Sequence, residues 1–117
     1  MNREFVMAAE FDRQWQKMGL GDTELSQLQE MLQTNPKAGK VIRGTNGLRK
    51  VRISFGKQGK RGGGRVAYVD FTVHKKVYLL TAYPKNIKDN LSKEERNLFA
   101  KVIVGFEREL TERYGPK

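Results

Sequence analysis

Residues 48–83 read LRKVRISFGKQGKRGGGRVAYVDFTVHKKVYLLTAY and contain three strand patterns in succession. Over residues 48–55 apolar and polar residues alternate, so the apolar side chains face one side of a strand and the basic side chains face the other. Two further strands are predicted over residues 65–73 and 76–83, with a tight turn at residues 74–75. Because the connections are short, the pattern favours an antiparallel meander.

Two helices are predicted ahead of these strands. Residues 8–18 carry apolar side chains at helical spacing. A second helix is predicted to be capped by Asp22 or Thr23 and to end before Pro36, because the residue that precedes a proline avoids the helical region. Residues 35–47 are rich in turn formers and are predicted to be a loop. The two helices are expected to form an antiparallel hairpin.

A third helix is predicted after the strands. Ser92 and Glu95 form a capping box, and the helix that they open is expected to run to about residue 113. Its apolar stripe comprises Leu98, Phe99, Val102, Ile103, Phe106 and Leu110. With a short first strand at residues 4–7, this order predicts one α+β domain over residues 1–117, in which helices cover one face of a small antiparallel sheet.

Composition excludes several classes of protein. A chain of 117 residues has room for one domain, and its lack of cysteine excludes a disulfide scaffold, a Cys-ligated zinc site and a thiol nucleophile. No apolar run approaches the roughly 20 residues needed to cross a bilayer, and the first residues do not resemble a signal peptide. We therefore expect a soluble cytoplasmic protein.

The positive charge is concentrated in one third of the chain. The formal net charge is +10, and no acidic residue occurs between Glu30 and Asp70. The remaining 13 basic residues balance the 13 acidic ones. Such a block is typical of a protein that binds a polyanion, with nucleic acid ahead of an anionic membrane. The basic residues of this segment are Lys37, Lys40, Arg43, Arg49, Lys50, Arg52, Lys57, Lys60, Arg61 and Arg65.

The titratable residues restrict the chemistry. His74 is the only histidine, which excludes a nuclease with two histidines as base and acid. The one close acidic group is Asp89 with Glu94 and Glu95, and the glutamates are explained by a helix N-terminus. The sequence therefore predicts neither a metal site nor a cofactor.

The predicted basic face could support RNA cleavage. Attack of a ribose 2′-OH on the adjacent phosphodiester needs a base, a stabiliser of the phosphorane charge and an acid. Arginines suit the second role, and Lys50, crowded by Arg49 and Arg52, is the best candidate base. Tyr83 and Lys85 could supply an acid or a stacking surface. A plain nucleic-acid clamp would show the same residues.

Five segments resemble one known family. They are GLRKVR at residues 47–52, GKRGGGRVAY at 59–68 and YLLTAYPKN at 78–86, supported by NPKAGKVIRGT at 35–45 and DNLS at 89–92. Together they resemble the RelE/HigB-type toxins of bacterial type II toxin–antitoxin modules.

The resemblance implies a RelE-like fold and metal-independent, ribosome-dependent cleavage of mRNA in the A site. By position in the motifs, it assigns the family's strand lysines to Lys50 and Arg52 and its phosphate-stabilising arginine to Arg65. The family's basic residue after the last strand falls on Lys85 or Asn86. It also implies a cognate antitoxin, of the helix-turn-helix HigA type, beside the ribosome with its mRNA and rRNA. The residues expected to hold RNA backbone are Lys37, Lys40, Arg49, Lys57, Lys60 and Arg61.

Two alternatives remain open at this point. A ParE-like member of the same superfamily would poison DNA gyrase instead of cutting RNA, although a gyrase poison needs no phosphate-cleaving cluster. A non-catalytic nucleic-acid-binding module would lose binding and growth arrest in proportion when Lys50 or Arg65 is replaced.

Overall fold

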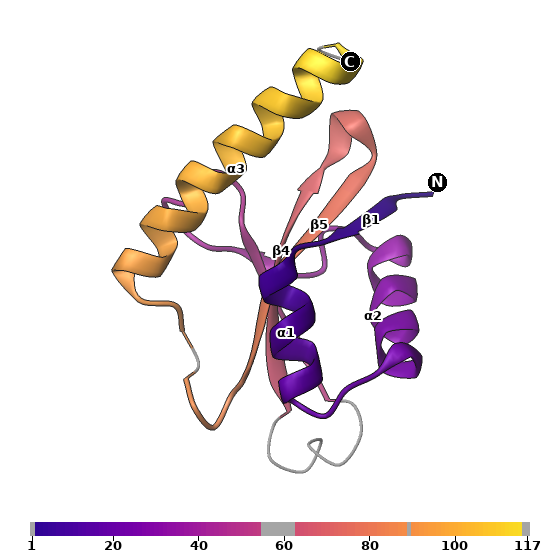
Figure 1. Cartoon of the computed structure of the whole chain (residues 1–117), viewed down its shortest axis with the longest axis vertical. Coiled ribbons are helices and arrows are strands. Elements are labelled where there is room, and N and C mark those ends of the chain that lie inside the picture. The colour runs from indigo at the N-terminus through magenta and orange to yellow at the C-terminus, as the bar shows by residue number, and fades with distance from the viewer. Residues whose placement is uncertain (1, 55–62, 89, 116–117) are drawn as a thin grey trace.

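The computed structural model describes residues 2–54, 63–88 and 90–115, and it contains three α-helices and one five-stranded sheet within these ranges (Figure 1). Phe55, Lys57, Lys60, Arg61 and Asp89 lie outside the described residues. The elements in chain order are β1 (Glu4–Met7), α1 (Ala9–Lys17), α2 (Asp22–Thr34), β2 (Lys40–Val41), β3 (Arg49–Ile53), β4 (Gly64–Phe71), a short 3₁₀ helix η2 (Thr72–His74), β5 (Lys76–Pro84) and α3 (Lys93–Tyr114).

The sheet has the strand order β1-β5-β4-β3-β2. The predicted meander is confirmed, because β3 pairs antiparallel with β4 and β4 pairs antiparallel with β5. The sheet as a whole is mixed, however, since β1 pairs parallel with β5. A parallel neighbour needs a long connection, and here most of the chain lies between the two strands. The predicted loop at residues 35–47 also contains β2, which pairs with β3.

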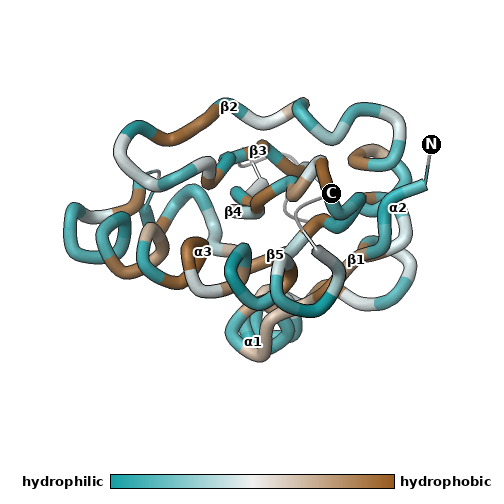
Figure 2. Tube along the Cα trace, turned by 90° about the horizontal axis from the view of Figure 1, so that it is seen from above, coloured by the Kyte–Doolittle hydropathy of each residue, from teal (hydrophilic) through white to brown (hydrophobic). Residues whose placement is uncertain are grey.

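Helices cover both faces of the sheet, so the prediction of a single covered face was wrong. One core cluster joins Phe11 and Trp15 of α1 with Leu28 and Leu32 of α2, and a second includes Ile103 of α3. Seen from above, the central strands lie between α2 and α3 (Figure 2). In the structure β4 and β5 are buried almost continuously, as is typical of strands covered on two sides.

The helix ends follow local capping chemistry. Ser92 caps α3 as predicted, since its Oγ accepts the Glu95 amide at 3.1 Å. The cap predicted for α2 was wrong: Gly21 is the N-cap, and its amide donates to Glu24 Oε1 at 2.8 Å, so Asp22 is already helical. Leu98 of the predicted apolar stripe is 60% exposed. None of the helices in the described ranges is apolar and long enough to span a membrane.

Candidate nucleic-acid interface

Three of the predicted catalytic residues form a row across the sheet. Arg52 of β3 is paired with Arg65 of β4, and Arg65 is paired with Tyr83 of β5. Directly paired residues of antiparallel strands lie on the same face, and so does Lys50, two residues from Arg52. The register therefore places these four side chains on one face of the sheet.

The basic end of this row borders an open cleft of about 440 Å³. Its lining residues are Ala38, Lys40, Lys50, Val51, Arg52 and Arg65. Lys40 reaches the cleft because β2 pairs it with Lys50. None of the described residues that line the cleft is acidic. Four cations facing one space produce a positive potential that favours a phosphate group. We call this space the cationic cleft.

The four cations of the cationic cleft differ in burial. Arg65 is only 3% exposed and donates to the Gly64 carbonyl at 3.0 Å, whereas Arg52 is exposed. Lys50 is half-buried, and its Nζ donates to Asn90 Oδ1 at 2.7 Å. The cleft thus combines the buried Arg65 with the more exposed charges of Lys40, Lys50 and Arg52.

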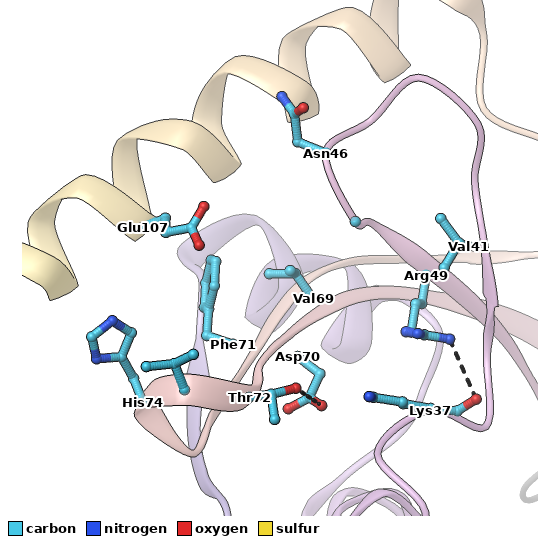
Figure 3. A pocket seen from close by; sticks show the side chains of 12 residues that line it. Lys37, Val41, Asn46, Arg49, Val69, Asp70, Phe71, Thr72, His74 and Glu107 are labelled. Carbon is cyan, nitrogen blue, oxygen red and sulfur yellow. Dashed lines mark hydrogen bonds between the residues drawn. The ribbon is translucent and has the colours of Figure 1, made fainter. Parts of the chain in front are cut away.

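The other predicted residues lie in different places. Lys85 is exposed in the turn after β5, and its amide donates to the Gly63 carbonyl at 3.1 Å, so it lies at the Arg65 end of β4. Lys37 and Arg49 instead line a separate cavity of about 330 Å³ (Figure 3). His74 lines this second cavity too, away from the cationic cleft.

Arg49 is engaged with the protein's own backbone. Its Nη1 donates to the Gly39 carbonyl at 2.7 Å and to the Lys37 carbonyl at 3.4 Å. Figure 3 shows the guanidinium turned toward the Lys37 carbonyl. The structure therefore brings Lys40, but neither Lys37 nor Arg49, together with the predicted catalytic residues.

A third, mostly apolar groove of about 680 Å³ begins at the Tyr83 end of the row. Met18 at the C-cap of α1, Ala82 of β5 and Phe99 of α3 contribute to its lining. Lys88 Nζ lies 5.2 Å from the centroid of the Tyr83 ring, a distance typical of a cation–π contact.

Sequence reasoning missed Asn90 and the glycine that precedes β2. Asn90 lies 40 residues from Lys50 along the chain, so no local pattern could have paired them. Gly39 did offer a signal, because a glycine inside a basic loop often marks a close backbone approach.

Among the residues that the structure describes, no three His, Asp or Glu side chains lie together in a group that could hold a metal ion.

Comparison with known proteins shows the family of this chain. The family described as the RelE toxin of the RelE/RelB toxin–antitoxin system matches residues 4–112. The chain belongs to the RelE toxin family. Within the described residues of this chain, the cationic cleft lies on β2, β3 and β4 and on Ala38 ahead of β2.

Solved RelE structures share the fold. The free E. coli RelE toxin carrying two arginine-to-alanine substitutions has a TM-score of 0.54 at 17% identity, covering 76% of this chain and 90% of its own. The isolated E. coli RelE toxin has a TM-score of 0.51 at 16% identity, covering 86% and 98%. The doubly substituted toxin in complex with an antitoxin RelBc peptide has a TM-score of 0.50 at 18% identity, covering 80% and 98%.

Proposed function

We propose that this RelE-family toxin is an endoribonuclease that cuts ribosome-bound mRNA in the A site and thereby stops translation. The observation that carries the proposal is the cationic cleft, in which Lys50, Arg52 and Arg65 share one sheet face. A phosphodiester lying in this cleft would meet a buried guanidinium and three further cations.

In this proposal, different residues supply the base, the acid and the charge stabiliser for attack by the ribose 2′-OH. The ribose O2′ forms a bond to phosphorus, the P–O5′ bond breaks, and the products are a 2′,3′-cyclic phosphate and a free 5′-OH. For this step Lys50 must act as the neutral amine, which takes the proton from the 2′-OH, and Tyr83 or Lys85 donates one to the leaving O5′. Arg65 stabilises the charge on the phosphorane, because a guanidinium held in place needs no reorganisation during the reaction.

The surrounding cations are proposed to hold RNA backbone. Arg52 and Lys40 at the mouth of the cationic cleft engage neighbouring phosphates of the mRNA. Lys37, together with Lys57, Lys60 and Arg61, engages more distant mRNA or rRNA backbone. Binding of this kind weakens with salt, with a slope of about −0.7 per phosphate for single strands.

We propose the partner and the location on the basis of the family match. One related RelE structure holds an antitoxin peptide, and we propose that this chain likewise binds a cognate antitoxin, of the helix-turn-helix HigA type. A toxin that acts on translating ribosomes works in the bacterial cytoplasm. The +10 net charge suits an acidic antitoxin segment that competes with RNA for the same cations.

The test is translation of a defined mRNA by purified components with the purified toxin, followed by primer extension. We expect cuts only when ribosomes are present, in register with the codons. Naked mRNA treated in parallel is the control. If translation continues and no cut appears, the nuclease proposal is wrong, and a DNA gyrase supercoiling assay then tests the ParE-like alternative.

A further inference from the structure

One wall of the cationic cleft is a backbone segment held by two side chains of the sheet. The segment is residues 36–39, which lead directly into Lys40 of β2. Ala38 of this segment lines the cleft, and so does Lys40 directly after it. Since β2 has only two residues, its own pairing with β3 provides little to hold the segment in place.

Tyr68 of β4 holds this segment through its hydroxyl group. The hydroxyl donates to the Pro36 carbonyl at 2.8 Å and accepts the Gly39 amide at 2.9 Å. Tyr68 is completely buried, and burial raises the pKa of its hydroxyl, which therefore keeps its proton at neutral pH. The bond to the Gly39 amide is buried and the bond to the Pro36 carbonyl is partly buried, so losing the hydroxyl costs most at the Gly39 amide.

Arg49 holds the same segment from the neighbouring strand, and we call Tyr68 and Arg49 together the clamp. It is the direct β3 partner of Tyr68 and donates to the carbonyls of Gly39 and Lys37. A Cβ added to Gly39 would stand 2.8 Å from the Lys50 carbonyl oxygen and 3.0 Å from the Tyr68 ring. Only glycine therefore lets the segment lie this close to β3.

We propose that Tyr68 and Arg49 are positioning residues of the cationic cleft. They fix residues 36–39 against the sheet and so hold Lys40 beside Lys50, which increases RNA affinity without contact between Tyr68 and RNA. Arg49, grouped by its sequence position with the RNA-binding cations, acts mainly through its own backbone contacts. The inference rests on the proposed function only in taking RNA as the polyanion.

Tyr68→Phe tests the clamp without changing any charge. We expect hydrogen exchange of the Gly39 amide to accelerate about tenfold, the loss expected for one buried hydrogen bond. Affinity for a short, non-cleavable 2′-O-methyl RNA should fall several-fold. The slope of log affinity against log salt should become less negative by about 0.7, because one phosphate contact is lost. The maximal cleavage rate with ribosomes should stay unchanged while KM rises. Tyr78→Phe, which removes a hydroxyl from the other core cluster, is the matched control.

A double-mutant cycle shows whether Tyr68 acts through Lys40. If it does, Tyr68→Phe combined with Lys40→Ala binds RNA no more weakly than Lys40→Ala alone. Additive losses overturn the inference, as does unchanged exchange at Gly39 or unchanged RNA affinity in Tyr68→Phe.

Gly39→Ala provides a second route if Tyr68→Phe does not fold. It pushes the segment from β3 without removing a charge or a hydrogen-bonding side chain, and we expect the same weakened binding. Gly105→Ala is its control, because a Cβ there meets nothing within 4 Å. Full RNA affinity in a folded Gly39→Ala protein overturns the clamp. A wild-type protein that neither binds RNA nor cuts mRNA on ribosomes overturns the proposed function and the clamp's role in it, whereas Gly39 exchange still reports whether the clamp exists.

Discussion

The cationic cleft and the second cavity both draw basic residues from the same acid-free segment, yet they use them differently. In the cleft, Lys40, Arg52 and Arg65 share a space lined by no acidic residue among those described. In the second cavity, Arg49 is bonded to backbone carbonyls and lies among residues that include Asp70 and Glu107 (Figure 3). The availability of a charge to a ligand is therefore decided by what the fold places beside it.

The largest effect is expected inside the cationic cleft. Arg65→Ala removes the buried guanidinium and should lower the cleavage rate at least about 100-fold, as loss of one preorganised charge-stabilising donor does elsewhere. Primer extension measures the rate, and binding to 2′-O-methyl RNA should weaken far less. Arg108→Ala on α3, outside the cleft, is the control. If binding and cleavage fall in proportion, the protein is instead a non-catalytic nucleic-acid-binding module.

In the second cavity, charge removal should affect stability and not RNA binding. Asp70 accepts two hydrogen bonds from Arg3, and both side chains are almost fully buried. Asp70→Asn leaves the Arg3 charge without its counterion and should lower the free energy of unfolding by about 3 kcal/mol. Urea denaturation measures this loss. Glu4→Gln, which breaks the more exposed Glu4–Lys76 pair, should cost much less.

The fold was largely predictable because its local signals agree with its global arrangement. The meander followed from alternation and short connections, and α3 followed from the Ser92–Glu95 capping box. The parallel pairing of β1 could not be predicted, since residues 4–7 contact β5 through the fold and not through sequence proximity. The row across the sheet became visible only once the register paired Arg52 with Arg65.

The candidate site was predictable in type and only partly in membership. The alternation over residues 48–55 predicted that Lys50 and Arg52 share one face of a strand, and the register confirms that placement. Lys40 lines the cationic cleft, whereas Arg49 is bonded to backbone carbonyls, and this difference depends on where residues 36–39 lie. The position of that segment depends in turn on Tyr68, which is 29 residues away from Gly39.

A smaller difference should separate Arg52→Ala from Lys37→Ala. Arg52 lines the cationic cleft, so its loss should make the slope of log affinity for 2′-O-methyl RNA against log salt less negative by about 0.7. Lys37 lies at the second cavity and engages more distant backbone, so its loss should change the slope for this short RNA less. Titrations at several salt concentrations measure both slopes. Equal slopes for the two variants would remove the distinction between the two regions.

The smallest effect is expected at the start of α3, outside both regions. The Lys88 side chain and the Ser92 amide hold the pKa of Glu95 below its ordinary value of 4.5. The ionised carboxylate therefore stabilises the folded state above pH 4.5, and this contribution is lost as the pH falls through the lowered pKa. Glu95→Gln should flatten that part of the stability–pH profile in acid denaturation. An unchanged profile would contradict the capping role.

The central claim is that RNA binds at the cationic cleft and not at the second cavity. An NMR titration of backbone amides with short 2′-O-methyl RNA tests it most directly. The account predicts the largest shifts at residues 38–41, 50–53 and 64–66, with residues 70–74 nearly unchanged. Largest shifts at residues 70–74, or shifts spread evenly over the basic surface, would contradict it.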